Sequence, residues 1–484
     1  MSALAFTTSS ISTILPEILL LVLAILILIV DIIGRKETDR ALGWLTAAGL
    51  AVILIVTILF SKPIPDDPFV FGGMLRYDGP AYTFTLLLLF AATIAALISV
   101  GVREVSNRGA FFAILVTATL GMVLMAASAD MIMLFLAFET TSISLYILAG
   151  FLKGDDESTE AGMKYFLFGA VISAVMLYGF SLLYGFTGHT NIYALADAMN
   201  AGEISPWVIG VLAILVLAGF GFKIAATPLH FWTPDVYQGA PTPITAFIST
   251  ASKAAGFIVL MRFMLAVFPA IEDQWALLLA IVAVATMTIG NLLAIPQKNI
   301  KRLLAYSSIA HAGYVLIGVV AISVFGTAAS MFYLLAYIVT NLAAFTVVIL
   351  FARSAGSDEI ADYAGLSRRS PWLAMALLIA FLSLAGMPPL AGFVGKFFVF
   401  AAAVQSGWIW LAFVGVINAI IGLYYYLTVL KVVYLYRSDD EDKPIEVPRL
   451  YVFGLAVCVA AIILIGIMSS PWLEWSLAAA QSWF

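Results

Sequence analysis

The residues most able to do chemistry are ionisable side chains set deep in apolar stretches. Glu139 lies in MLFLAFETTSISLYIL, and Lys253 lies in AFISTASKAAGFIVL, about twelve residues from either end of its apolar stretch. Lys223 and Lys396 each stand beside a run rich in proline or glycine. A charge at the centre of a membrane helix costs roughly 2.5–3.5 kcal/mol, so we expect each of these residues to have a function. Amines and carboxylates buried in this way can bind and release a proton, which is the chemistry they indicate.

Other ionisable residues in apolar stretches leave two interpretations open. Lys164 and Lys431 lie closer to the ends of their stretches, where a long side chain can reach the membrane surface or exchange a proton. Arg262 is expected to reach the surface in this way. His311, in YSSIAHAGY, is suited to relay a proton, with a packing histidine as the alternative. His230 is either a second relay or a group at a helix end.

The composition indicates which elements must hold these side chains. Apolar residues make up 63% of the 484 positions and charged residues 11%, too apolar a balance for a soluble domain. The apolar stretches run about 20 residues without alternation, which predicts membrane-spanning helices and excludes a β-barrel. A single cysteine, Cys458, allows no intrachain disulfide, and no Cys/His cluster is present to hold a metal. We therefore expect an all-α polytopic membrane protein without a redox centre of its own.

Hydropathy predicts about fourteen spans. The first, from residue 14, is too long for a cleavable signal and is followed, not preceded, by basic residues. The predicted spans are 14–34, 42–60, 80–102, 109–128, 130–152, 162–187, 207–227, 241–268, 275–296, 302–324, 327–352, 371–403, 407–436 and 449–470.

The distribution of lysine and arginine between the loops supports this topology. Fifteen basic residues fall on one side, which the positive-inside rule assigns to the inside, and only Lys62 and Arg76 fall opposite. Both termini are then expected on the outer side. The fifteen are Arg35, Lys36, Arg40, Arg103, Arg108, Lys153, Lys298, Lys301, Arg302, Arg353, Arg368, Arg369, Arg437, Lys443 and Arg449.

Two of the predicted spans contain helix-breaking residues. LAGFGFKIAATPLHFWTPDVYQGAPTP surrounds Lys223 and SLAGMPPLAGFVGKFFVF surrounds Lys396. Proline interrupts a helix, and unwound backbone is tolerated in the membrane only beside protein or a cavity. The breaks lie five spans apart, a pattern typical of internal repeats around an ion path.

From this spacing we predict two inverted five-helix repeats, made of helices 4–8 and 9–13, with helices 7 and 12 discontinuous. The predicted parts of the chain are an N-terminal three-helix segment (1–108), a first repeat (109–268), a second repeat (269–436) and a C-terminal helix (437–484).

These residues carry a resemblance that covers nearly the whole chain. The runs KYFLFGAVISAVMLYGFSLLYGFTG, FKIAATPLHFWTPDVYQGAPTPITAFISTASKAAGF and KRLLAYSSIAHAGY resemble the antiporter-like subunits of respiratory complex I. Within that family, LPEILLLVLAILILIVDI and PDVYQGAPTP resemble the N-type subunit rather than the L- or M-type.

The resemblance implies a hydrated proton path across the membrane arm. By motif, Glu139 matches the glutamate of the fifth helix, and Lys223, Lys253 and Lys396 match the lysines of the seventh, eighth and twelfth helices. We hypothesise that Glu139 gates, Lys223 and Lys253 load, His311 relays and Lys396 releases the proton. Two charges about 6 Å apart interact by roughly 3 kcal/mol at an effective dielectric constant near 20, enough to switch a proton's preferred site.

The resemblance also implies partners. It predicts no cofactor in this chain, with NADH, flavin, iron–sulfur clusters and quinone held by other subunits. The expected partners are an M-type antiporter-like subunit, small K- and J-type subunits and the lipid bilayer, with no nucleic acid. The expected location is the inner (plasma) membrane of a bacterium.

Three other functions remain as alternatives. A subunit of a multi-subunit Na⁺/H⁺ antiporter shares the glutamate, the lysines and the broken helices. A structural anchor would leave the buried charges unexplained. A solute carrier would need a polar pocket at the midplane, and no such pocket is legible in the sequence.

Overall fold

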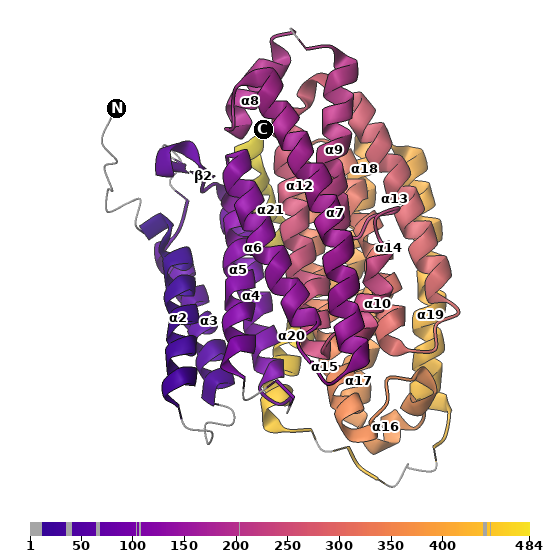
Figure 1. Ribbon diagram of the computed structural model, residues 1–484. Coiled ribbons are helices and arrows are strands. Elements are labelled where there is room, and N and C mark those ends of the chain that lie inside the picture. The colour runs from indigo at the N-terminus through magenta and orange to yellow at the C-terminus, as the bar shows by residue number, and fades with distance from the viewer. Residues whose placement is uncertain are drawn as a thin grey trace.

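Long apolar helices make up nearly the whole chain in the computed structural model, and most of them run side by side (Figure 1). The structure describes residues 12–34, 41–63, 68–102, 104–105, 108–202, 204–438, 443–445 and 447–484. In these ranges twelve helices are long and apolar enough to cross a membrane, or thirteen if a bent pair near the C-terminus counts as one span. The prediction of an all-α polytopic membrane protein is confirmed.

The elements follow one another in this order. The first group is α2 (Leu15–Ile33), α3 (Ala41–Phe60), β1 (Phe69–Val70), η1 (Phe71–Gly73), β2 (Leu75–Arg76) and α4 (Gly79–Ser99). Next come α5 (Gly109–Ala127), α6 (Met131–Ala149), α7 (Asp156–Thr187), α8 (Ile192–Asn200), α9 (Pro206–Ile224), α10 (Trp232–Gly239), α11 (Thr242–Phe247), η2 (Ile248–Ser252) and α12 (Lys253–Val267). Then follow η3 (Pro269–Ile271), α13 (Glu272–Ala294), α14 (Ile300–Val320), α15 (Val324–Ala355), η4 (Ile360–Tyr363), α16 (Leu366–Arg369), α17 (Pro371–Ala385), α18 (Ala391–Gln405) and α19 (Ile409–Leu435). The last elements are α20 (Arg449–Ile467), α21 (Ser469–Ala480) and η5 (Gln481–Trp483).

One predicted span is divided as expected, and another differs from the prediction. The predicted span 371–403 consists of two shorter helices, α17 and α18, in agreement with a discontinuous twelfth helix. The predicted last span ends at Ile467, where the chain bends by 85° into α21. Hydropathy did not indicate α21, because Ser469–Ala480 is short and contains two serines, a proline and a glutamate in its first half. Proline is favoured in the first turn of a helix, so this composition is compatible with a new helix start.

The centre of the bundle consists of the α11–α12 span, α14 and α15. Their apolar windows are fully buried, whereas only a third of the α2 and α7 windows is buried. The central segments contain the buried polar groups Ser249, Ser308, His311 and Asn341. A helix buried on all sides can carry such groups, because neighbouring helices supply their hydrogen-bond partners.

Two sets of contacts define the two ends of the bundle. At one end, called the basic end below, the amide of Ile300 bonds to Asp358 and the side chain of Arg353 to the carbonyl of Gly101. At the other, called the terminal end, Arg76 donates to the carbonyl of Ser482. Of the basic residues that support the predicted topology, Arg35, Lys36, Arg40 and Arg103 lie outside the described residues.

Arg262 corrects one prediction. Its side chain is 3% exposed and donates two hydrogen bonds to the Asp78 carboxylate, at 2.9 and 2.8 Å, and one to the carbonyl of Ala126. The expectation that Arg262 reaches the membrane surface is therefore wrong. Hydropathy gave the depth of Arg262 along its span, but it could not show that Asp78, the N-cap of α4, lies beside it. A buried guanidinium is stable there because a carboxylate compensates its charge.

Candidate functional site

The two predicted helix breaks have the same backbone geometry. α9 ends at Ala225, which has a left-handed conformation (φ 60°), and α17 ends at Gly386 (φ 88°). In both cases amides at the helix end bond back to two carbonyls of the last turn, which satisfies groups that a helix end leaves free. A proline, Pro228 or Pro389, follows three residues later in each. The prediction that helices 7 and 12 are discontinuous is borne out.

Lys223 lies directly before the first break and is 2% exposed. Its ammonium group donates to Ser142 Oγ on α6 at 2.9 Å and lies 4.7 Å from the centre of the Phe138 ring. Between the described side chains of Lys223 and Glu139 no ion pair forms within 4.0 Å. In this conformation the Lys223 ammonium group is bound by Ser142, which lies one helical turn from Glu139, and not by Glu139 itself.

Glu139 lies at the edge of the bundle. Its Oε1 is buried without a hydrogen-bond partner among the described residues. Ile132, Leu136, Ile143 and Ile147 of the same helix are each about half exposed and form an apolar stripe along α6. Since Glu139 interrupts this stripe at helical spacing, a protein that covered the stripe would contact the glutamate.

Lys253 lies at the middle of the eighth span, directly after the π-helical turn η2. Its ammonium group donates to the carbonyl and the hydroxyl of Ser308, at 2.5 and 2.6 Å. The Tyr337 hydroxyl also donates to Ser308 Oγ, at 2.9 Å, and Tyr237 lies 3.3 Å from it. Asn341 extends this network by donating to the Tyr337 hydroxyl at 3.1 Å. π-Helical turns are rare and are frequent at functional sites.

His311 lies three residues beyond Ser308 on α14 and is 4% exposed. Its Nδ1 lies 2.8 Å from the hydroxyl of Tyr333, and its Nε2 lies 3.3 Å from that of Tyr426. The Tyr426 hydroxyl in turn bonds to Ser307 Oγ. Ser308 binds Lys253, whereas Ser307 is linked to His311 through Tyr426. Because the two serines are consecutive, a single peptide unit separates these two sets of hydrogen bonds.

Lys396 is 5% exposed and lies beyond the second break, on α18. Its ammonium group donates to the carbonyls of Leu384 and Ala385, at 2.9 Å each, and lies 4.8 Å from the Tyr314 ring centre. The carbonyls at a helix C-terminus carry partial negative charge, so the last turn of α17 stabilises the ammonium.

A small cavity lies between His311 and the second break. Its volume is about 10 Å³, which leaves room for about one water molecule. The lining residues come from α14, α15 and both sides of the break: His311, Tyr333, Ala336, Tyr337, Thr340, Ser383, Leu384 and Gly392. The cavity therefore lies between His311 and Leu384, and the carbonyl of Leu384 binds Lys396.

The three further candidates make different contacts. Lys164 pairs with Glu160 at 2.7 Å and with Asp235 at 2.6 Å at the basic end. His230 is buried within the first break, where its Nδ1 lies 3.3 Å from Thr227 Oγ1. Lys431 is exposed on α19 and lies 5.4 Å from the centre of the Tyr436 ring.

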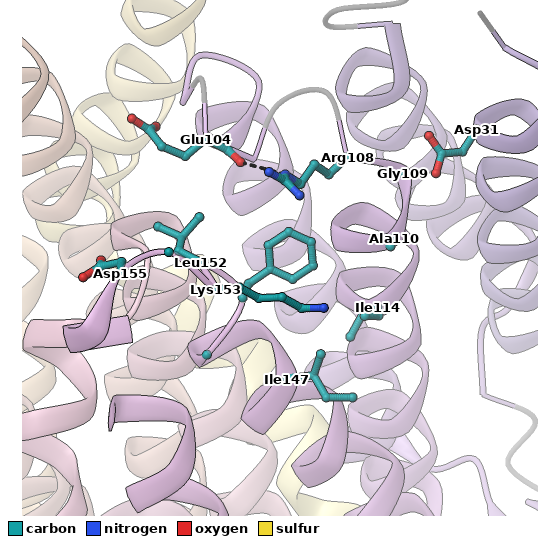
Figure 2. Close-up of a pocket in the computed structure, with 13 residues that line it drawn as sticks. Asp31, Glu104, Arg108, Gly109, Ala110, Ile114, Ile147, Leu152, Lys153 and Asp155 are labelled. Carbon is teal, nitrogen blue, oxygen red and sulfur yellow. Dashed lines mark hydrogen bonds between the residues drawn. The ribbon is translucent and has the colours of Figure 1, made fainter. Parts of the chain in front are cut away.

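A large open cavity of about 1070 Å³ lies at the basic end and is separate from these residues. Figure 2 shows its charged side chains, Asp31, Glu104, Arg108, Lys153 and Asp155, around an apolar wall. Glu139, Lys223, Lys253, His311 and Lys396 are absent from its lining. In the described part of the chain no group of three or more His, Cys, Asp or Glu could hold a metal ion.

Several polar residues of the site were missed in the sequence. Ser142, Ser308 and Tyr426 contact the buried charges, but a single serine or tyrosine in a membrane helix is common and gives no signal. Asn341 could have been identified from the sequence, because it is the single amide side chain in the 32-residue apolar helix α15. Intramembrane amides are costly and indicate a polar network.

Comparisons with known proteins agree with this architecture. Residues 128–422 match the family described as NADH:quinone oxidoreductase/Mrp antiporter, TM. The chain belongs to this family. It is 42% identical to NADH-quinone oxidoreductase subunit N of Trichlorobacter lovleyi, over 98% of both chains. It is 40% identical to NAD(P)H-quinone oxidoreductase subunit 2 of a Nostoc species, over 95% of this chain and 91% of that protein.

Solved structures of the NADH:quinone oxidoreductase/Mrp family show the same fold. One chain of respiratory complex I from Thermus thermophilus with bound aureothin has a TM-score of 0.79 at 32% identity, covering 95% of this chain and 98% of that chain. A chain of the Mrp complex from Dietzia has a TM-score of 0.86 at 21% identity, covering 98% and 97%. The second likeness shows the fold alone.

Proposed function

We propose that this chain is the N-type membrane-arm subunit of an NADH-quinone oxidoreductase and that it moves protons along Glu139, Lys223, Lys253, His311 and Lys396. The observation that carries the proposal is that three lysines, each 5% exposed or less, lie at the two helix breaks and the π-turn. Their ammonium groups are held by hydroxyls and carbonyls and form no ion pair in the described residues. Charged side chains inside membrane spans are costly, and they mark ion and proton pathways.

The contacts support a route from Lys253 to Lys396. Ser308 accepts from Lys253, and Ser307, the next residue along the chain, bonds to Tyr426, which contacts His311. Hydroxyls can accept one proton and donate another, so each of these two hydroxyl groups can take part in moving a proton, although no hydrogen bond in the described residues joins Ser308 to Ser307. The small cavity beyond His311 is also lined by Leu384, whose carbonyl binds Lys396, so it brings the histidine and the second break together. Lys223 precedes Lys253 in this sequence of steps.

Glu139 has the position of a gate at the start of the path. Glu139 interrupts the exposed apolar stripe on α6, so a neighbouring subunit that packs on this stripe can change the surroundings of the Glu139 carboxylate. A movement of Glu139 toward Lys223 would create the ion pair that is absent in this conformation and would retain the proton on Lys223. Movement away would release it toward Lys253.

The repeat organisation is part of this proposal. The matched geometry of the breaks supports two five-helix repeats in residues 109–268 and 269–436, after an N-terminal segment (1–108) and before a C-terminal helix (437–484). The basic end then faces the bacterial cytoplasm, and both termini lie on the outer side of the inner membrane. The partners are an M-type antiporter-like subunit and the small K- and J-type subunits, whereas NADH, flavin, iron–sulfur clusters and quinone belong to other subunits.

The test of this proposal is Lys253→Met in the assembled complex. Methionine keeps the volume of the side chain but removes the proton site. Loss of an acid–base group costs about 10²–10⁴ in rate, so we expect proton pumping in membrane vesicles to disappear. Lys431→Met, on the exposed face of α19, is the matched control and should pump normally. Normal pumping by an assembled Lys253→Met variant would contradict the proposal.

A second candidate is a subunit of a multi-subunit Na⁺/H⁺ antiporter, favoured by the fold shared with the Mrp complex. The two functions differ in what copurifies with the chain. An oxidoreductase subunit brings flavin and iron–sulfur absorption into the purified complex, and its proton movement needs NADH. An antiporter subunit brings neither, and its proton movement needs a sodium gradient.

A further inference from the structure

The short helix α10, which follows the first break, forms ion pairs with two other helices through one acidic residue. The two carboxylate oxygens of Asp235 accept hydrogen bonds from Lys164 on α7, at 2.6 Å, and from Arg302 on α14, at 2.7 Å. Arg302 also donates to Gln238 of α10, at 3.3 Å. We call the three residues Lys164, Asp235 and Arg302 the latch.

The position of Asp235 in the repeat is informative. It stands ten residues beyond the left-handed Ala225, and Lys396 stands ten residues beyond the left-handed Gly386. The place that holds a lysine of the proposed path in the second break therefore holds an acid in the first. This acid has no role in the path, yet it binds cations from two different helices.

α10 connects the latch to Lys253. Tyr237, two residues beyond Asp235, places its hydroxyl 3.3 Å from Ser308 Oγ, which also accepts the hydrogen bond from Lys253. A displacement of α10 would remove Tyr237 from Ser308 and change the hydrogen bonding of the ammonium group. α10 therefore links the latch, through Tyr237 and Ser308, to the ammonium group of Lys253 on α12.

A second contact holds α10 in place without the latch. Trp232, in the first turn of α10, stacks on Tyr165 of α7 with 4.2 Å between ring centres and 10° between planes. Tyr165 is the neighbour of Lys164 along the chain, so α7 holds α10 by one apolar and one ionic contact. The apolar contact is insensitive to salt, whereas the ionic one is not.

We propose that Asp235 is a positioning residue of the first repeat. Through the latch it holds α10, and hence Tyr237 and Ser308, in the arrangement in which Lys253 exchanges its proton. This inference rests on the proposed function. Lys164, Asp235 and Arg302 side chains are each about one-third exposed, 37%, 33% and 32%, whereas Lys253 is 2% exposed. Salt at the basic end therefore screens the latch but not Lys253.

The experiment is the variant Asp235→Asn in the intact complex, in vesicles with the basic end outward. Turnover of NADH-driven proton pumping is measured from low salt, where the Debye length is about 30 Å, to high salt, where it is about 3 Å. For the unmodified protein we expect turnover to fall as salt rises. The variant should start about three- to tenfold lower, because two partly exposed ion pairs are lost, and should no longer respond to salt. Asp235→Glu, which keeps the charge, should restore most of the turnover and most of the salt response.

The matched control is Asp358→Asn. Asp358 lies between α15 and η4 at the basic end and pairs with Lys301, at the start of α14, at 3.1 Å. In the described residues no hydrogen bond or ion pair joins its side chain to α10. This variant makes the same chemical change and should keep both turnover and salt response. Lys164→Met and Arg302→Met each leave Asp235 with one cation and should show intermediate losses.

Assembled Asp235→Asn with unchanged turnover and salt response would overturn the inference. If that variant does not assemble, the two single cation variants decide, since each retains one ion pair and the Trp232–Tyr165 stack. Unchanged behaviour of both would exclude the latch. Lys253→Met separates the two hypotheses: if it stops pumping while the latch variants pump normally, the latch is wrong and the proposed path stands.

Discussion

The two breaks share a backbone geometry but differ in what holds their charges. At the first break the lysine, Lys223, lies before the left-handed residue and Asp235 lies beyond it, fixed by cations from two helices. At the second break the lysine, Lys396, lies beyond the left-handed residue, and two carbonyls of α17 hold it. Ion pairs therefore fix the helix beyond the first break, whereas partial backbone charges hold the lysine beyond the second.

This difference is compatible with the roles that we propose for the two breaks at the two ends of the proton path. Carbonyl oxygens bind an ammonium group but are not left as uncompensated charges when it loses its proton. A carboxylate in an ion pair would be left uncompensated. The second break can therefore release a proton without breaking an ion pair, and the first keeps its geometry while Lys223 exchanges.

The largest expected effect is at the second break. Lys396→Met removes the only ammonium group bound to the α17 carbonyls in the described residues, and loss of a proton-transfer group costs about 10²–10⁴ in rate. We expect NADH-driven acidification of vesicles to be abolished while the complex assembles. Near-normal acidification would show that the two breaks are not arranged in series.

The backbone at the second break should be nearly as sensitive. Gly386→Ala places a Cβ on a residue with φ 88° and within 2.9 Å of Lys396 Cδ. A non-glycine residue in this conformation costs about 1–3 kcal/mol, and the lysine must also move. We expect a lower unfolding temperature of the complex and at least a severalfold loss of pumping. Gly356→Ala, whose Cβ meets no atom within 4 Å, is the control for strain alone.

A smaller effect is expected between the breaks. Tyr426→Phe keeps the ring but removes the hydroxyl that joins Ser307 to His311. A hydrogen bond of this kind contributes about 0.5–1.5 kcal/mol, so pumping should fall by roughly two- to tenfold. Turnover in vesicles measures this, and Tyr424→Phe, on the exposed face of α19, serves as the control. An unaffected Tyr426→Phe variant would indicate that the proton bypasses this hydroxyl.

The smallest effect tests the first break alone. Ala225 has φ 60°, a conformation that glycine adopts more readily, so Ala225→Gly should leave the fold unchanged and stabilise it by up to about 1 kcal/mol. We expect a slightly higher unfolding temperature and unchanged pumping. A clear loss of pumping would show that the first break depends on stiffness that glycine does not provide.

Much of the fold could be predicted, because a membrane imposes a length and an apolar composition on every span. Lys223, Lys253 and Lys396 stood out for the same reason, since each breaks an apolar pattern that the bilayer otherwise enforces. α21 and the early start of α7 at Asp156 could not be predicted from hydropathy, because neither segment contains a long apolar run. The role of Arg262 was misjudged because its partner Asp78 lies 184 residues away along the chain.

The sequence by itself determined that the chain spans a membrane, where two spans break, and which side chains are charged at depth. Composition and proline position decide these features locally, through solvation and backbone sterics. Only the tertiary structure decided that Lys223 bonds to Ser142 and not to Glu139, and that Asp235 ties α10 to two other helices. Such pairings depend on how distant helices pack, and a serine or an aspartate has the same local pattern whether or not a lysine faces it.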